Sequence, residues 1–217
     1  MTRLNVVNGM AMLSYLRENN IDLGGEVVPF NEGMCEGETT EDIFSGEFEF
    51  ERCGVHGVGV EEYEDIVINP LAPLFTFEYD ELHLFFDEDM FCQINLITLL
   101  AFLDSNEYDG KIALHLIDYD FNEIKCVEIK PQGFYNVYKR VLIDKQIPEI
   151  VLPDIMMDAV VNYLDYSKED NELTEFVQQN INMQENDLLD EMYNRFKYLG
   201  LGDIQLQKII DKAKFKF

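Results

Sequence analysis

The order of apolar and polar positions along the chain is typical of an α/β protein. An apolar run at 4–7 is interrupted by Asn8 and Gly9, and residues 10–18 then carry hydrophobic positions at helical spacing. This order predicts a strand, a tight turn and a helix. A second strand is expected at 26–30, with its proline near the end, where a missing backbone donor is tolerated.

The junction of strand, turn and helix recurs further along the chain. Residues 82–86 are apolar on both faces near the end of the run, as in a strand buried inside a sheet. Three acids at 87–89 occupy the turn, and 90–103 are hydrophobic around most of the helix, so this helix should be the most buried one. Strands at 111–117 and 124–129 are close enough to form an antiparallel hairpin. A small, mostly parallel sheet with one antiparallel hairpin is therefore expected.

The last part of the chain has a helical pattern. Helices are expected at 134–144, 154–166, 171–180, 185–198 and 203–214. Only the short run 149–152 could add a further strand. We therefore expect an α/β domain at residues 1–130 followed by an all-helical domain at residues 131–217.

Residues 31–65 interrupt this regular pattern. The segment is rich in glycine and contains twelve acidic residues but only one basic residue, Arg52. We expect a long excursion with one short amphipathic helix, and loops of this length are often functional. Residues 54–60 contain three glycines, yet no strand precedes them and no helix is expected after them, so they are a weak candidate for a phosphate loop.

The charge of the chain limits the classes of partner. Acidic side chains outnumber basic ones by 43 to 16, for a net charge of −27, which repels phosphate backbones and anionic bilayers. Neither nucleic acid nor a membrane is therefore an expected partner, whereas a basic protein is. Most of the excess lies before residue 131, which indicates two differently employed regions; the competing interpretation is a solvated surface that is simply acidic. The C-terminal helices are poor DNA readers because residues 169–191 contain no Lys or Arg.

The remaining composition gives no sign of a metal, a disulfide or a membrane segment. The four cysteines are scattered without a CxxC pair, which signals neither a zinc site nor a disulfide framework. We expect reduced, mostly buried thiols. The chain shows no leader and its longest apolar run is about half a membrane span, so a soluble, cytoplasmic protein is expected. No cofactor is identified.

Three blocks of sequence carry a resemblance to a known family. They lie at residues 5–9, 31–37 and 84–96, and the third is the most specific: an apolar strand, an acidic turn, then an aromatic residue, Gln and a leucine-rich helix. Over residues 4–120 the chain resembles the bacterial domain of unknown function numbered 1835. Residues 152–210 are more loosely similar to the helical region that often follows this domain.

The resemblance implies a fold and a domain order, but no reaction, because the family has no established biochemical role. In many relatives the first strand begins with His, and Asp follows the Asn-Gly pair. This chain has Asn5 and Met10 at those positions. Two polar groups that could bind a ligand or activate water are therefore missing here.

The strongest site prediction comes from the sheet itself. In a parallel α/β sheet, ligands bind beyond the carboxyl ends of the strands, where the following helices begin. This rule gathers polar residues from three strand ends into one candidate site: Asn8, Gly9, Glu32, Asp87, Asp89 and Gln93. Their carboxylates could hold Mg²⁺ or keep one carboxyl protonated as a general acid. The competing interpretation is that the acids only cap the next helix.

The other reactive side chains have plainer interpretations. His83 and His115 lie within strands among apolar neighbours, where a hydrogen-bonded structural role is the ordinary one. Cys35 lies near acidic residues that should raise its pKa and suppress its reactivity. The sequence thus favours a regulatory or protein-interaction module. The alternatives are a metal-dependent or small-molecule enzyme using the strand ends and, disfavoured by charge, a transcriptional regulator.

Overall fold

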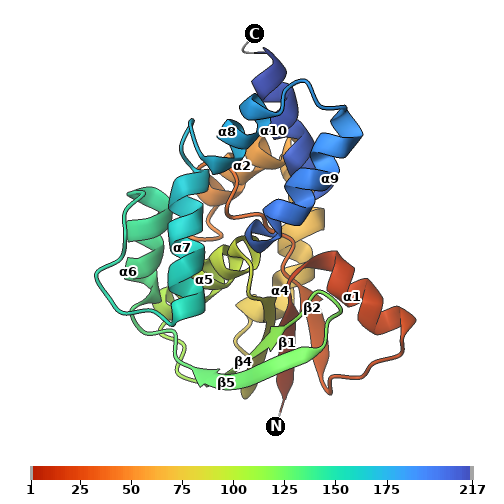
Figure 1. Ribbon diagram of the computed structural model, residues 1–217. Coiled ribbons are helices and arrows are strands. Elements are labelled where there is room, and N and C mark those ends of the chain that lie inside the picture. Colours follow the sequence, from red (N-terminus) through yellow and green to blue (C-terminus); the bar gives the residue numbers. More distant parts are fainter. Residues whose placement is uncertain (1, 216–217) are drawn as a thin grey trace.

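A computed structural model describes residues 2–215 of the chain. Its centre is a five-stranded sheet, which confirms the predicted α/β class (Figure 1). The strands are β1 (Arg3–Val7), β2 (Glu26–Pro29), β3 (Glu81–Asp87), β4 (Lys111–Ile117) and β5 (Glu123–Ile129).

The strands are arranged in the order β2-β1-β3-β4-β5. The first four are parallel, and β5 pairs antiparallel with β4, as the short connection between them predicts. Val7 at the end of β1 aligns with Pro29 of β2 on one side and with Phe85 of β3 on the other. The carboxyl ends of these three strands therefore lie at one edge of the sheet.

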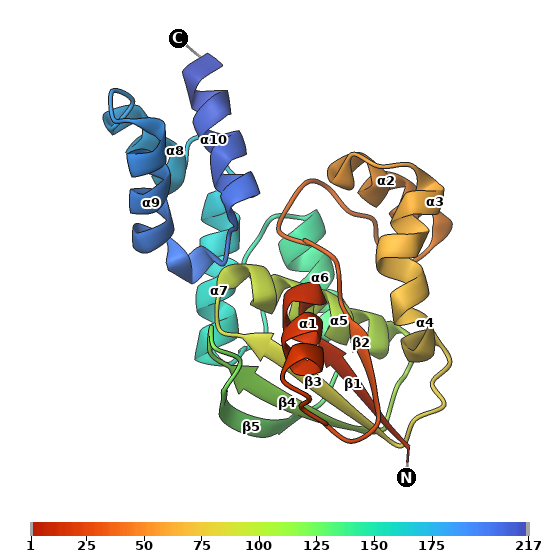
Figure 2. The ribbon, with the colours of Figure 1, turned by 90° about the vertical axis from the view of Figure 1, so that its right-hand side faces the viewer.

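Helix α1 (Gly9–Glu18) covers one face of the sheet. Its buried residues Met12, Leu13 and Leu16 pack against Val7 of β1 and Phe85 of β3. Apolar positions three or four residues apart in sequence form one stripe on a helix, which is why this short segment presents a continuous hydrophobic face. Figure 2 shows α1 in front of the sheet.

Helix α5 (Met90–Ser105) covers the opposite face and is buried along nearly its whole length. Its other side is covered by α6 (Phe134–Tyr138) and α7 (Asp154–Tyr166). A helix enclosed on all sides must be hydrophobic all round, and this confirms the prediction that residues 90–103 form the most buried helix. The chain continues from α6 into a π-helical turn, η2 (Lys139–Ile143).

The acidic segment contains more helix than expected. It forms α2 (Gly46–His56), α3 (Val60–Tyr63) and the π-helical turn η1 (Glu64–Ile68), and α4 (Asn69–Phe75) follows. The prediction of a single short helix was wrong. The segment has few hydrophobic residues, so its helical pattern is weak in the sequence. Several of these, among them Phe48, are fully buried against the rest of the protein, and this packing stabilises the helices.

The C-terminal helices follow the predicted order. They are α8 (Glu172–Gln179), α9 (Glu185–Arg195), the 3₁₀ turn η3 (Lys197–Leu199) and α10 (Asp203–Phe215). Figures 1 and 2 show them above α7, away from the sheet. Residues 149–152 do not form the further strand that was considered: Val151 is 97% exposed, and no strand lies beside this segment within residues 2–215.

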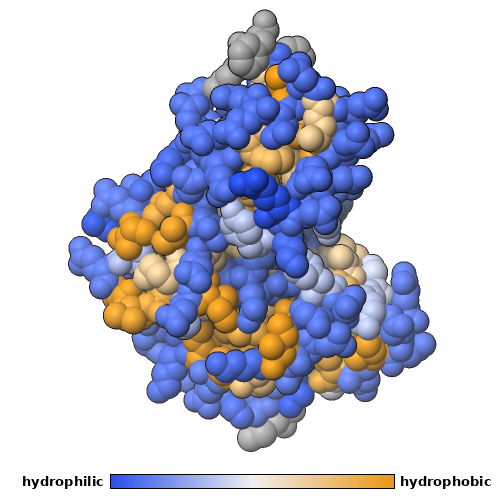
Figure 3. Space-filling view, in the orientation of Figure 1, coloured by the Kyte–Doolittle hydropathy of each residue, from blue (hydrophilic) through white to orange (hydrophobic). Residues whose placement is uncertain are grey.

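The surface in Figure 3 is mostly hydrophilic, with hydrophobic groups over the lower half, where α6, α7 and β5 lie. Exposed apolar side chains in these regions include Ile124, Ile150 and Val161. Within residues 2–215, none of the helices combines the length and the apolar character needed to cross a bilayer.

Candidate functional site

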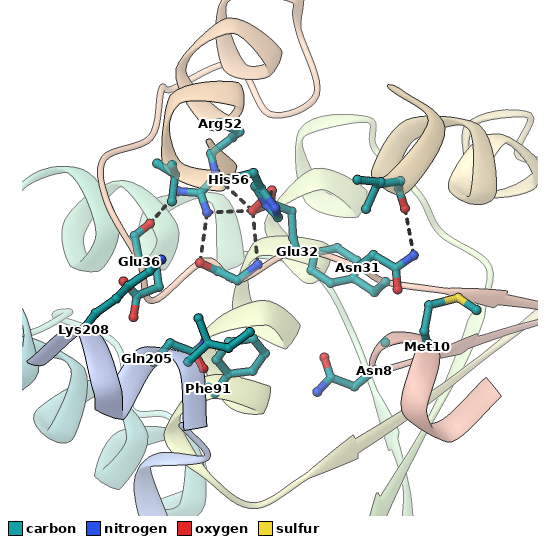
Figure 4. A pocket seen from close by; sticks show the side chains of 16 residues that line it. Asn8, Met10, Asn31, Glu32, Glu36, Arg52, His56, Phe91, Gln205 and Lys208 are labelled. Carbon is teal, nitrogen blue, oxygen red and sulfur yellow. Dashed lines mark hydrogen bonds and ion pairs between the residues drawn. The ribbon is translucent and has the colours of Figure 1, made fainter. Parts of the chain in front are cut away.

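A cleft of about 490 Å³ opens beyond the carboxyl ends of β1 and β2. Its walls come from the start of α1, the loop after β2, α2, the first turn of α5 and α10 (Figure 4). The order of the strands reverses between β1 and β3, and crevices at such switch points are the usual ligand sites of open α/β sheets. The polar side chains that line it are Asn8, Asn31, Glu32, Glu36, Arg52, His56, Gln205 and Lys208.

Glu32 is the centre of the hydrogen-bond network in this cleft. Its carboxylate is buried and contacts side chains from α2 and α3. Oε2 accepts from Arg52 Nε at 2.9 Å and lies 2.7 Å from Arg52 Nη2. Oε1 lies 2.6 Å from His56 Nε2 and accepts from the Tyr63 hydroxyl at 3.1 Å. The acidic segment therefore folds around one of its own carboxylates.

Arg52 holds the loop after β2 in place. Besides its ion pair with Glu32, its guanidinium donates to the backbone carbonyls of Gly33, Glu36 and Glu38 at 2.6 to 3.0 Å. Arginine offers five N–H donors in a rigid fork, and these contacts occupy all five. Arg52 is therefore a structural cation that has no donor left for a ligand.

The ion pair keeps Glu32 charged. Burial alone would raise the pKa of this carboxyl, but the hydrogen bond from His56 and the charge of Arg52 outweigh burial, so its pKa lies below the ordinary value. A carboxylate that stays charged has no proton to donate as a general acid, but it can orient a neighbouring group. Here Glu32 orients the imidazole of His56.

His56 connects this buried pair to the open space of the cleft. The side chain is 23% exposed and lines the cleft, while Nε2 is held by Glu32. Within residues 2–215, Nδ1 has no hydrogen-bond partner. A carboxylate on one ring nitrogen fixes the tautomer and leaves the other nitrogen as a proton acceptor, which is the arrangement of base and orienting group in many enzymes.

Asn95 links the ends of β1 and β2 through hydrogen bonds. This buried side chain of α5 donates to Asn8 Oδ1 at 3.0 Å and to the Glu32 backbone carbonyl at 2.7 Å, and it accepts from the Met34 backbone N–H at 2.9 Å. Asn8 in turn donates to Cys92 Sγ at 2.7 Å. Asn8 and Glu32 therefore belong to one network, although 24 positions separate them in the sequence.

The amino end of α1 also opens into the cleft. Gly9 has a φ of 86°, a left-handed conformation that glycine adopts without strain, and this turns the chain sharply from β1 into the helix. No side chain caps the free N–H groups of α1, whereas Ser45 and Asp89 cap α2 and α5. Unpaired N–H groups at the positive end of a helix favour an anionic or carbonyl oxygen.

The structure does not bring all six predicted site residues together. Asn8, Gly9 and Glu32 line the cleft. Asp87 and Asp89 instead line a different cavity, between the β4–β5 turn and α7. Asp89 caps α5 by accepting a hydrogen bond from the Cys92 N–H at 2.7 Å. This is the helix-capping role that the competing interpretation gave to these acids.

Gln93 lies outside both cavities. It is fully buried and donates to the Asp87 carbonyl at 2.6 Å, while its Oε1 atom has no partner. Its side chain binds the end of β3 from inside the core and does not reach the cleft. Asp89, by contrast, is buried beside Asp87, and burial together with this neighbour raises the pKa of Asp89 to about 6, although the Cys92 N–H opposes the rise.

The two positions at which the chain departs from the suggested family have different surroundings. Asn5 is fully buried in β1 and donates to the carbonyls of Gly24 and Glu26, so it holds the β1–β2 connection and does not line the cleft. Met10 does line the cleft and is 47% exposed. A hydrophobic side chain therefore occupies the position where many members of the suggested family have Asp.

The prediction of mostly buried thiols is confirmed. Cys35, Cys53 and Cys92 are buried, as expected. Burial, reinforced by the charge of Glu36, raises the pKa of Cys35 far above its ordinary value, in line with the inert thiol expected there. Cys126 is the exposed one, because it lies on β5, the edge strand of the sheet.

Sequence reasoning missed Arg52, His56 and Asn95. A signal existed for Arg52, since a lone base among twelve acids is a candidate for a buried ion pair. Asn95 is one of the few polar residues in a helix that is otherwise apolar. Nothing local indicated His56, because its role depends on a carboxylate 24 positions away.

Comparison of the chain with protein-family models, with curated proteins and with solved structures finds no match in any of the three. The resemblance to the bacterial domain of unknown function therefore stays a prediction, and the functional argument depends on the geometry of the site.

Proposed function

We propose that the cleft binds a small polar molecule and that His56 and Glu32 act on it as a proton-transfer pair. The single observation that carries this proposal is the position of His56, with one ring nitrogen on a buried carboxylate and the ring on the wall of the cleft. Histidine is the side chain used most often for proton transfer near neutral pH. This favours the enzyme or small-molecule alternative over the interaction module.

The lining of the cleft indicates the kind of molecule. Although the chain carries a net charge of −27, the charges in the cleft balance, with two carboxylates, Glu32 and Glu36, against two cations, Arg52 and Lys208. Glu36 is held by the hydroxyl of Tyr166, and Lys208 has no ion-pair partner in the part of the chain that the structure describes. Lys208 and the uncapped end of α1 together favour a ligand with an anionic group.

Ligand binding should be visible as stabilisation of the folded state. We expect one member of a panel of sugar phosphates, nucleotides and small carboxylic acids to raise the melting temperature. A ligand at about 100 times its Kd adds roughly 2.7 kcal/mol. For a chain of this size that corresponds to a rise of about 5 to 10 °C.

The variant His56→Gln tests the proton-transfer pair. It should keep most of the binding but abolish any turnover of the bound molecule, because glutamine donates to Glu32 and accepts no proton. Glu62→Gln, which changes an exposed carboxylate on α3, is the matched control and should leave both unchanged. A panel without any thermal shift, or a turnover that survives in His56→Gln, contradicts the proposal.

A second candidate function, binding of a basic protein, is favoured by the outer side of α2. Phe50 is 74% exposed there, and the exposed carboxylates Glu47 and Glu51 lie beside it on the same helix. An exposed aromatic ring among acids suits a partner with apolar and cationic side chains. Phe50→Ser should abolish such binding, and rising salt should weaken it. A partner whose binding is unaffected by both Phe50→Ser and rising salt does not bind this surface.

A further inference from the structure

Four polar side chains meet on the same face of the sheet as α1, over the strands that α1 does not cover. His83, His115 and Cys126 come from the strands β3, β4 and β5, and Glu123 comes from the start of β5. Figure 2 shows these three strands side by side. His115 and Cys126 lie directly opposite each other in the antiparallel pair, so their side chains project from the same face. This cluster is separate from the cleft at the strand ends.

One ligand atom from each of His115, Glu123 and Cys126 lies within 4.8 Å of the other two. His115 Nδ1 contacts Glu123 Oε2, and Cys126 Sγ is 3.9 Å from His115 Nε2. In a tetrahedral zinc site, the bond lengths to nitrogen, oxygen and sulfur put ligand atoms roughly 3.4 to 3.7 Å apart. Glu123 and Cys126 are both exposed, so their side chains have room to rotate. To reach this spacing, Cys126 Sγ has to turn from the Nε2 side of the His115 ring toward Nδ1.

The opposite side of the His115 ring is already arranged as it is in metal sites. Its Nε2 atom lies 2.8 Å from His83 Nδ1, and His83 Nε2 lies 3.6 Å from Glu81 Oε2. Metal-binding histidines nearly always donate their second N–H to an acceptor that fixes the tautomer. Here a chain of two N–H groups can run from His115 through His83 to the carboxylate of Glu81.

We propose that His115 Nδ1, the Glu123 carboxylate and the Cys126 thiolate bind a Zn²⁺ ion, with water as the fourth ligand and with His83 positioning His115. One nitrogen, one oxygen and one sulfur ligand suit borderline-soft Zn²⁺, whereas Mg²⁺ and Ca²⁺ take oxygen ligands. The two anionic ligands balance the charge of the ion.

The protons balance as the ion binds. Without metal, both contacts of His115 are satisfied by the tautomers in which His115 Nδ1–H donates to Glu123 and His83 Nδ1–H donates to His115 Nε2. In the bound form His115 carries its proton on Nε2 and donates to His83, while His83 carries its proton on Nε2, toward Glu81. Both imidazoles stay neutral, and the only proton released is that of the Cys126 thiol.

Cobalt(II) is a direct probe of this site, because a cobalt–thiolate bond gives a charge-transfer band and tetrahedral cobalt gives strong visible absorption. We expect chelator-treated protein to take up one equivalent of Co²⁺ in the presence of excess Mg²⁺, and one equivalent of Zn²⁺ to displace it. Cys126 is the only exposed thiol of the four, so the sulfur band reports on this position.

Three variants locate the ion. Cys126→Ser should remove the sulfur band, and Glu123→Gln should weaken binding at least about tenfold. Both residues are exposed, so neither change should unfold the protein, which circular dichroism checks. Glu128→Gln changes another exposed acid on β5 and should bind Co²⁺ as the natural protein does. An absent sulfur band, or one that persists in Cys126→Ser, overturns the proposal.

Discussion

The burial of Asp89 makes a quantitative prediction about the variant Asp89→Asn. This carboxyl is only 8% exposed, is packed against Gly200 and lies near the charge of Asp87. Burial is the largest influence on it and raises its pKa to about 6, from an ordinary value of 3.8. Asparagine caps a helix as well as aspartate does, so Asp89→Asn keeps the hydrogen bond from Cys92 and removes only the charge.

The size of the effect follows from the pKa. The pKa of Asp89 is about two higher in the folded state, and each whole number of pKa corresponds to about 1.4 kcal/mol. Ionised Asp89 is therefore unfavourable in the folded state by roughly 3 kcal/mol. Because the pKa is higher in the folded state, the folded protein binds more protons between about pH 4 and pH 6, and its stability falls as the pH rises through this window. Asp89→Asn should therefore be more stable than the natural protein by roughly 3 kcal/mol at about pH 8 and by almost nothing at about pH 4.

Urea unfolding at the two pH values measures both quantities. The control is Asp203→Asn, which changes an exposed acid in the first turn of α10 and should not stabilise the protein at either pH. A gain at about pH 8 of less than roughly 1 kcal/mol, or an equal gain at both pH values, would show that Asp89 is not a buried anion in solution.

Two further predictions concern stability and use the same unfolding assay. Arg52→Met leaves the buried Glu32 carboxylate without its cation and three carbonyls without their donor, and should cost about 3 to 5 kcal/mol; a loss below about 1 kcal/mol would show that the pair is not buried in solution. Gly200→Ala should cost at least about 1 to 2 kcal/mol, because Gly200 has a φ of 68° and a Cβ atom there would lie 2.3 Å from the Asp89 carboxyl. Gly54→Ala, on the open side of α2, is its control and should stabilise by roughly 0.5 to 1 kcal/mol; the same sign for both glycines would contradict this reasoning.

The regular elements could be predicted because their signals are local. The helical spacing of apolar residues at 10–18 shows that one side of that helix is buried, and the apolar character of 90–103 shows that all sides of that helix are buried. Neither pattern depends on which element covers the buried side. The hairpin of β4 and β5 follows from a connection too short for a crossover. Residues 149–152 show the limit of this reasoning, because an apolar run forms a strand only where another strand offers hydrogen bonds.

The candidate site was only partly predictable. The rule about strand ends brought Asn8 and Glu32 to the same cleft, because parallel strands must end at the same edge of the sheet. It could not show that Asp89 lies on another side of the first turn of α5, or that Gln93 lies in the core. Those positions depend on the rotation of α5 about its own axis, which its packing against the sheet, α6 and α7 sets.

The sequence by itself determined the class of fold, the order of most elements and the acidic character of the protein. Only the tertiary structure decided how the acidic segment folds, with Arg52 and His56 held on Glu32, and which side chains share a face of the sheet, as His115 and Cys126 do. The physical reason is that periodicity specifies which side of an element is buried, whereas partners far apart in sequence meet only through strand register and the packing of helices.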